Sequence, residues 1–354
     1  MIMETSQIYK LLNDLDECRY NYNVWVVANV LDTVQNSKDF VIHTNFSEFF
    51  TKAEFASIIS AITSVFGYVR TFYSEIELIE YILKFKTSLD FSKVIIYNFA
   101  RDGINEGKKS LVPSFCNLFG IKYTGSNPFV ISLLRNKFIY SKYLESMGIP
   151  IPKTLLYSEG ILYKPNSFAY PELLIAKNNC EAASLGMTEN NIVKFDNNMN
   201  DFINMIHILS KEMSSKQLIL QEFIEGCECE VFTIKYKGSY HAFMPIELLI
   251  RDSKIITDSI SNSYNYTFRA LSERYSESVC TKIKETTESA ARILNIGNYA
   301  RFDYRINYAG EPFLIDIAGT PYLTRHSSIA YLFTNVLKLE YEDIFKLIVA
   351  VLLD

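Results

Sequence analysis

The chain of 354 residues is 49% hydrophobic and 21% charged, a balance that is typical of soluble globular proteins. Its net charge is −5, with 35 basic and 40 acidic residues and no basic block, which argues against a nucleic-acid partner. No run of about 20 apolar residues predicts a membrane span, and Met1–Lys10 lacks the pattern of a signal peptide. We therefore expect a cytoplasmic protein without a membrane partner.

Strands and helices alternate in the first third of the chain. Apolar runs that are typical of strands lie at Val24–Leu31, Tyr68–Tyr73, Val94–Tyr97 and Ile121–Tyr123. Helical patterns between them cover 51–66, 75–85 and 109–119, and the first two open with capping-box spacing at Thr51/Glu54 and Ser74/Glu77. This alternation predicts an α/β unit with a mostly parallel sheet. We assign it to residues 1–127, because the turn cluster Thr124–Pro128 follows.

The middle of the chain continues with a long helical pattern over Phe129–Met147, which Gly148 ends. Leu173–Lys177 is a strand that ends in a lysine, and a loop of small and polar residues follows it. Further strands are predicted at Leu218–Gln221, Glu230–Lys235 and Ala242–Leu249, a loop at Thr257–Tyr266, and helices at Ser276–Leu294 and Glu340–Leu353. We divide this part into units at 128–215 and 216–354, because a chain of this length should form two or three cores.

The most informative stretch is Tyr299–Ser328. Its first half alternates, with Arg301, Asp303 and Arg305 on one face and apolar residues on the other, which is the pattern of a half-buried strand. A turn follows, and then a second run in which Leu314, Asp316 and Ala318 share a face. If the two runs pair as a hairpin, Asp303 and Asp316 lie at or near directly opposite positions on the polar face.

Two interpretations of this aspartate pair remain open. Opposed carboxylates on neighbouring strands repel each other unless a cation lies between them, and Mg²⁺ with a substrate phosphate is the usual occupant. Alternatively, both acids are solvated, and Arg301 and Arg305 neutralise them. The six cysteines offer no competing metal site, because only Cys227 and Cys229 are close and a lone C-x-C is a poor zinc signal.

Four segments in order resemble the D-alanine–D-alanine ligase branch of the ATP-grasp superfamily. They are GIKYTGSNPFVISLLRNKFIYSKYLESMGIPIP (120–152), LLIAKNNCEAASLGM (173–187), LILQEFIEGCECEV (218–231) and the stretch 299–328 described above. The resemblance covers about two-thirds of the chain. It implies an ATP-grasp fold, α+β in its C-terminal half, with 128–215 and 216–354 as the two ATP-grasp subdomains. The N-terminal mostly parallel α/β domain precedes them, and the 216–354 subdomain carries the metal and acceptor site.

The resemblance also implies a chemistry. Such enzymes use ATP to phosphorylate a carboxylate, and an amine then attacks the acylphosphate to give an amide, ADP and phosphate. ATP is the nucleotide, and Mg²⁺, or Mn²⁺ in its place, would be held by Asp303 and Asp316. The residues matching the family's nucleotide-binding positions are Lys137, Lys177, Gln221, Glu222, Phe223, Ile224 and Glu228. Without the other motifs, Lys137 and Lys177 would be interpreted as solvated surface lysines.

Catalytic and substrate-binding roles follow from the same motifs. Arg301 matches the arginine that stabilises the oxyanion, and Ser184 lies in the loop that closes over the phosphates. Ser327 matches the serine that holds the acceptor's carboxylate, although an ordinary helix N-cap is an equal alternative. The family implies a homodimer, with a small carboxylate and an amine as substrates.

The sequence departs from the family pattern at several site positions. Asp316 replaces a glutamate, Ala318 an asparagine that would bind metal, and Ala183 a loop serine. Tyr322 replaces a glycine beside the acceptor. These changes favour substrates other than those of a cell-wall D-alanine ligase.

Two further departures lie outside those motifs. No lysine clearly matches the lid lysine of related ligases, for which Ser261 or Lys254 is the nearest counterpart. The N-terminal unit carries IIYNFARDG, and we expect its Asn98 and Arg101 to bind a carboxylate or amine different from the substrates of cell-wall ligases. We therefore expect an amino-acid or similar carboxylate–amine ligase. The alternative from another class is a nucleotide-binding pseudoenzyme or sensor, which the changed metal site would favour.

Overall fold

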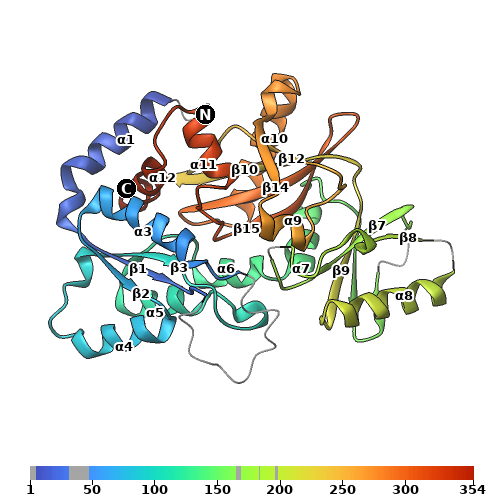
Figure 1. The fold of residues 1–354 in the computed structure, drawn as a ribbon, viewed down its shortest axis with the longest axis horizontal. Coiled ribbons are helices and arrows are strands. Elements are labelled where there is room, and N and C mark those ends of the chain that lie inside the picture. The colour runs from blue at the N-terminus through green and yellow to red at the C-terminus, as the bar shows by residue number, and fades with distance from the viewer. Residues whose placement is uncertain (1–4, 32–47, 165–168, 183, 196–197) are drawn as a thin grey trace.

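The structure is a computed structural model that describes residues 5–31, 48–164, 169–182, 184–195 and 198–354. Its strands form three sheets, one in the N-terminal unit and two in the rest of the chain. Figure 1 shows them side by side, with the N-terminal sheet at the lower left, the C-terminal sheet at the upper centre and the central sheet at the right. The fold is mixed α/β, as the sequence predicted.

The N-terminal sheet has the order β2-β1-β3-β4, and every neighbouring pair is parallel. Its strands are β1 (Asn23–Ala28), β2 (Val69–Phe72), β3 (Val94–Phe99) and β4 (Lys122–Tyr123). Helices α3 (Lys52–Phe66), α4 (Glu75–Phe85) and α5 (Leu111–Phe119) connect them. Thr51 and Glu54 form both bonds of the predicted capping box, so the start of α3 follows from local sequence.

The two faces of this sheet pack against different partners. Val24 and Val26 face α1 (Thr5–Cys18), α3 and the last helix, α12 (Glu342–Leu353), whereas Trp25 and Val27 face the other way. The hydroxyl of Tyr97 in β3 donates to the carbonyl of Phe345 in α12 over 2.7 Å. The first and last segments of the chain therefore share one core (Figure 1).

The C-terminal sheet is antiparallel, with the order β13-β12-β10-β14-β15, and β11 pairs with β10. Its strands are β10 (Gly226–Tyr236), β11 (Ser239–Ala242), β12 (Ile246–Ile250), β13 (Tyr266–Ala270), β14 (Tyr299–Asn307) and β15 (Pro312–Ala318). Helix α10 (Glu277–Ile293) packs on one face, where Phe302, Tyr304 and Ile306 are fully buried. The opposite face carries the charged residues of the alternating pattern.

The central sheet is also antiparallel, with the order β6-β5-β9-β7-β8. Its strands are β5 (Thr154–Ser158), β6 (Ile161–Tyr163), β7 (Leu173–Asn178), β8 (Ile192–Lys194) and β9 (Gln217–Glu222). Helix α8 (Met199–Glu212) contributes Phe202, Ile206 and Leu209 to the core against this sheet. The predicted strand at 173–177 is therefore confirmed, and Lys177 lies near its end.

The prediction of one long helix over 129–147 is wrong. The structure has two helices, α6 (Pro128–Leu134) and α7 (Lys137–Ser146), with a break at Arg135 and Asn136. Asn136 caps the second helix, because its side chain accepts a hydrogen bond from the Ile139 N–H over 3.1 Å. Apolar periodicity continues across the break, so hydrophobic pattern alone did not reveal it.

The loop predicted at 257–266 is also partly wrong, because residues Asp258–Ser263 form helix α9 and β13 begins at Tyr266. Thr257 caps α9 by accepting from the Ile260 N–H. A four-residue helix, α11 (Ser328–Tyr331), continues into a π-helical turn at Leu332–Val336. Within the described residues, we find no helix with the length and apolarity needed to cross a membrane.

Candidate active site

A cavity of about 390 Å³ is lined by residues of the central and C-terminal sheets and by segments of the N-terminal unit that lie outside its strands. It brings together thirteen of the residues selected from the sequence: Arg101, Lys137, Lys177, Ser184, Gln221, Glu222, Phe223, Glu228, Arg301, Asp303, Asp316, Tyr322 and Ser327. Asn98 and Ile224 are not among the lining residues. Asn98 is buried in β3, where its backbone N–H donates to the Thr124 hydroxyl and its side-chain oxygen accepts from the Ala100 N–H.

Strands β14 and β15 pair as the predicted hairpin, and Asp303 lies directly opposite Asp316. A bulge follows this pair, so that Tyr304 lies opposite Leu314 and Ile315 has no partner in the register. The bulge turns Leu314 into the core and leaves Ile315 on the cavity wall. The prediction that Leu314 shares a face with Asp316 is therefore wrong, because strict alternation fails at a bulge.

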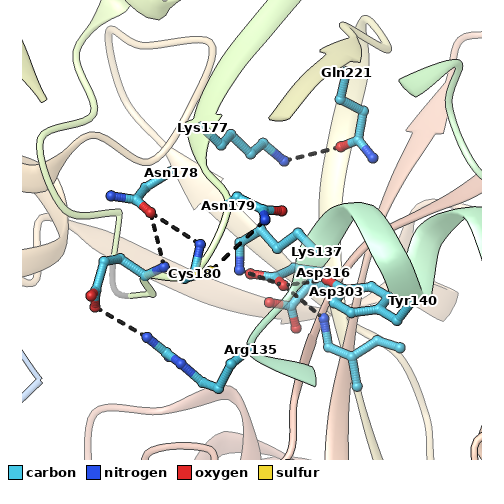
Figure 2. Close-up of polar contacts among 12 residues, drawn as sticks. Arg135, Lys137, Tyr140, Lys177, Asn178, Asn179, Cys180, Gln221, Asp303 and Asp316 are labelled. Carbon is cyan, nitrogen blue, oxygen red and sulfur yellow. Dashed lines mark hydrogen bonds and ion pairs between the residues drawn. The ribbon is translucent and has the colours of Figure 1, made fainter. Parts of the chain in front are cut away.

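Each aspartate of the pair has its own basic partner. An oxygen of Asp316 accepts from Lys137 Nζ at 3.0 Å and from the Tyr140 hydroxyl at 2.7 Å (Figure 2). Arg301 forms a two-pronged contact with Asp303, in which Nε and Nη2 each lie 2.8 Å from a carboxylate oxygen. Both aspartates therefore line the same cavity as the lysines.

The cations set the charge state of the pair. Burial raises the pKa of Asp316, but Lys137 and Lys177 outweigh it and hold that pKa below its usual value. For Asp303, burial is the stronger effect and raises the pKa despite the contact with Arg301. The pair therefore carries unequal charge, with Asp316 the more strongly ionised.

A hard cation would fit between these carboxylates only with oxygen ligands from a bound molecule. In the described part of the chain, no three His, Cys, Asp or Glu side chains lie close enough to hold a metal by themselves. Mg²⁺ typically binds one or two carboxylates and completes its octahedron with water and substrate phosphates. Two opposed aspartates beside two lysines match that donor set.

Lys177 and the loop after it form the next part of the wall. Lys177 Nζ donates to the side-chain oxygen of Gln221 over 3.2 Å, and burial lowers the pKa of this lysine (Figure 2). Asn178 organises the loop by accepting from the N–H groups of Cys180 and Glu181. Ser184 adopts a left-handed backbone conformation with φ 52° and lines the cavity, while Ala183 lies outside the described residues.

The helix break at Asn136 connects Lys137 to this loop. The Lys137 N–H donates to the Asn179 carbonyl at 3.1 Å, and the Phe138 N–H donates to the Asn179 side chain at 2.9 Å. These bonds use N–H groups that the first turn of a helix leaves without intrahelical partners. They fix Lys137 next to the strand that carries Lys177.

The far end of the cavity is built on Arg305, which the sequence analysis did not select. Its Nε donates to the Ile224 carbonyl at 2.6 Å, and its other nitrogens contact Glu228 and the Gly226 carbonyl. A side chain at Gly226 would collide with the Ile306 carbonyl, with Cβ only 1.9 Å from its oxygen. Glycine is therefore required where β10 begins, between the Gln221–Ile224 segment and Glu228.

Comparison with known protein families identifies the family to which this arrangement belongs. Residues 158–350, more than half of the chain, match the family described as D-ala D-ala ligase C-terminus. The chain belongs to this family. It is an ATP-grasp family, as the sequence motifs indicated, and membership implies ATP-dependent ligation. A search of the curated proteins finds no match.

Solved structures of ATP-grasp ligases share the fold. The D-alanine–D-alanine ligase from Bacillus anthracis complexed with ATP has a TM-score of 0.64 at 16% identity, over 94% of this chain and 97% of that one. VanG D-Ala:D-Ser ligase from Enterococcus faecalis has a TM-score of 0.63 at 14% identity, over 94% and 99%. D-alanyl-alanine synthetase A from Vibrio cholerae has 0.64 at 15% identity, over 95% and 99%.

This member of the D-Ala–D-Ala ligase family has a third carboxylate beside the aspartate pair. Glu230 on β10 lies opposite Asp303 on β14, so Glu230, Asp303 and Asp316 form a row across three strands. Its carboxylate lies 3.1 Å from Arg301 Nη2 and accepts a hydrogen bond from the Ser328 hydroxyl. Burial raises the pKa of Glu230 to about 7. The alternation of Glu228 and Glu230 in the sequence was a signal for a shared strand face.

In this ligase-family site, Ser327 has the N-cap position that was one of the two interpretations of the sequence. The Ser327 hydroxyl donates to the Thr324 carbonyl at 2.7 Å and accepts from the Ala330 N–H, so it acts as the N-cap of α11. Of the two lid positions, Ser261 lines the cavity. Lys254 is largely exposed, pairs with Glu225 at 3.5 Å and is not part of the wall.

Proposed function

We propose that the protein is an ATP-dependent ligase that joins an amino acid or similar small carboxylate to an amine. A carboxylate oxygen attacks the γ-phosphorus of ATP, and ADP leaves. The amine nitrogen then attacks the acylphosphate carbon, the C–O bond to phosphate breaks, and the nitrogen loses a proton. The observation that supports this proposal is the convergence of Lys137, Lys177 and Arg301 on the Asp303–Asp316 pair in one cavity.

The proposed roles follow from position and charge. Lys137 and Lys177 neutralise the nucleotide phosphates, a task that suits an ammonium group acting as a point charge. Asp303 and Asp316 hold Mg²⁺, which when bound neutralises further phosphate charge. Arg301 presents an always-charged donor fork to the oxyanion that forms when the amine attacks.

Nucleotide recognition is proposed for the wall between β9 and β10. Gln221 offers a side-chain amide for the adenine edge, with Glu222, Phe223 and the backbone of Ile224 next to it. Glu228 binds the ribose hydroxyls and is positioned by Arg305. Arg305 also lies over the Phe223 ring, 4.7 Å from its centroid, so one arginine holds both residues in place.

The test is ATP turnover. The protein is incubated with ATP, Mg²⁺ and pooled amino acids in both stereochemical forms, and ADP is measured. We expect release of ADP and phosphate only with particular pools, and no release when EDTA is present. Calorimetric binding of ATP without turnover in any pool would instead favour a nucleotide-binding sensor, for which Ala318 and the exposed Lys254 are the motivating observations.

A further inference from the structure

A cluster of charged side chains lies beside the aspartate pair, and the roles proposed above do not use it. At its centre is Glu48, whose carboxylate lies 3.1 Å from Lys108 Nζ, 3.2 Å from Arg135 and 3.7 Å from Arg101, and also contacts Lys109. All five side chains are at least nine-tenths buried. We call Arg101, Lys108, Lys109 and Arg135 the basic cluster.

The basic cluster carries more positive charge than its described carboxylate partners cancel. Besides Glu48, the only acid that contacts it among the described residues is Glu181, which lies 2.9 Å from Lys108 and 3.1 Å from Arg135. With Lys108 left out of the count, these two carboxylates face three cations, Arg101, Lys109 and Arg135. Burying uncompensated cations is costly, and burial indeed lowers the pKa of Lys109. Such an excess is explained when a ligand brings the missing negative charge.

Three members of the basic cluster, Arg101, Lys109 and Arg135, line the cavity directly. The Nε atoms of both arginines are buried, and neither has a hydrogen-bond partner in the described part of the chain. Arg101 is otherwise fixed, because it donates to the Thr320 carbonyl and lies 4.1 Å from the Tyr322 ring centroid. A rigid, buried guanidinium with an N–H to spare is suited to a carboxylate.

The place of the basic cluster within the cavity indicates which substrate it serves. Arg135 immediately precedes the Asn136–Lys137 helix start, and its partner Glu181 lies in the loop that leads to Ser184. Arg101 contacts the Thr320–Tyr322 segment that follows β15. The basic cluster is therefore next to the phosphoryl-transfer residues, on the side of the N-terminal unit.

We propose that the carboxylate that is phosphorylated belongs to a molecule with a second carboxylate, and that Arg101, Lys109 and Arg135 bind that second group. This inference rests on the proposed ligase function. The substrate class is a dicarboxylic acid or an acidic amino acid. A carboxylate is the ligand because these cations already pair with one carboxylate, that of Glu48.

The test compares acids with their amides on the wild-type protein. ADP release is measured with aspartate and glutamate, in both stereochemical forms, against asparagine and glutamine. Because a charged hydrogen bond is worth about 1.5–3 kcal/mol, we expect kcat/KM to be about 10- to 100-fold higher for an acid than for its amide. The melting temperature should also rise with the acid and not with the amide.

A variant of Lys109 tests whether the preference for the acid arises at the basic cluster. Lys109→Met should raise the KM for the acid about 10-fold or more, with the KM for ATP unchanged, and Lys109→Arg is the matched control that keeps the charge. If Lys109→Met does not fold, the comparison of acid and amide on the wild type decides alone.

Several results would overturn the inference. Equal turnover of acid and amide would refute it while leaving the ligase function intact. A rise in the KM for ATP instead would show that the basic cluster serves the nucleotide. If neither these probes nor the pooled amino acids give ADP, the proposed function fails. A melting shift specific to the acids would then still support the binding site, and its absence would refute both.

Discussion

We call the two ends of the cavity the nucleotide end and the substrate end after the ligands proposed for them, and they are built in different ways. At the nucleotide end, Lys177, Gln221 and Glu228 lie on strands β7, β9 and β10, and the last two are close in sequence. At the substrate end, Arg101 and Tyr322 come from segments far apart in the chain. At the first end, Lys177 and Gln221 lie on paired strands of the central sheet, and Glu228 lies on β10, which follows β9 directly in the chain. The second end depends on how the N-terminal unit docks on the C-terminal sheet.

This difference indicates which part of the cavity can change its substrate specificity. A residue at the nucleotide end is held by strand register, and we expect a substitution there to disturb the proposed binding of ATP. The basic cluster is held by side-chain contacts between units, and it can change without altering any strand. The experiments below test whether the two ends are separable in this way.

The largest effect on turnover is expected at the Asp303–Asp316 pair, which lies between the two ends. Asp303→Asn or Asp316→Asn should lower kcat for ADP release at least about 100-fold, because the charge that stabilises the transferring phosphoryl group is lost. Asp14→Asn on exposed α1 is the matched control and should leave turnover unchanged. Full activity of both active-site variants would remove the basis of the proposed metal site.

At the nucleotide end, Lys177→Met should cost about 100-fold in kcat/KM for ATP, since a buried cation beside Gln221 is removed. Lys254→Met, at an exposed ion pair with Glu225, should change the same quantity by less than about 3-fold. Steady-state kinetics on both variants measures this contrast. A larger effect at Lys254 would mean that it reaches the nucleotide as a lid lysine after all.

At the substrate end, Glu48→Gln should lower the free energy of unfolding by about 3 kcal/mol at pH 7, because it leaves buried cations without their partner. Burial raises the pKa of Glu48, but Lys109, Arg135, Lys108 and Arg101 outweigh it and hold the pKa well below 4.5.

The stabilisation by Glu48 is therefore fully present above pH 4.5 and is lost as the pH falls through the lowered pKa. Urea denaturation at pH 7 and below pH 4 checks this dependence. Glu145→Gln, at an exposed pair with Lys142, is the control and should cost less than about 1 kcal/mol.

The smallest effect is expected for Glu230→Gln, which keeps the shape of the side chain but removes one of the two carboxylates that hold Arg301. We expect kcat to fall about 5-fold with the KM for ATP unchanged. Glu228→Gln, two residues away on the same strand, should instead raise the KM for ATP. If both variants shift the same parameter, the two ends are not separable on β10.

The sequence predicted the parts of the fold that depend on local pattern. The capping box at Thr51, the parallel N-terminal sheet and the opposition of Asp303 and Asp316 all follow from periodicity and turn signals. The break at Asn136 and the bulge at Ile315 could not be predicted in this way, because each depends on contacts with segments that are distant in the sequence. Asn136 and Lys137 depend on Asn179, more than forty residues away.

The same reasoning explains which site residues were missed. Arg305 and Glu230 were visible as strand residues, but their roles depend on which strands are neighbours and in which register. Glu48, Lys109 and Arg135 belong to no motif, and only the docking of separate segments brings them together. Motifs therefore led to the residues that we propose for the nucleotide, and tertiary structure was needed to find those that we propose for the substrate.

The core shared by α1, β1, β3 and α12 has a consequence for the chain as the ribosome makes it. One face of the N-terminal sheet, with Tyr97 among its residues, is partly covered by α12, which is translated after all the other described helices and strands. The nascent N-terminal unit must expose the part of that face that α12 covers until residues 342–353 emerge from the exit tunnel. Removing α12 should therefore yield a product that chaperones retain during synthesis, even though every cavity-lining residue would still be present.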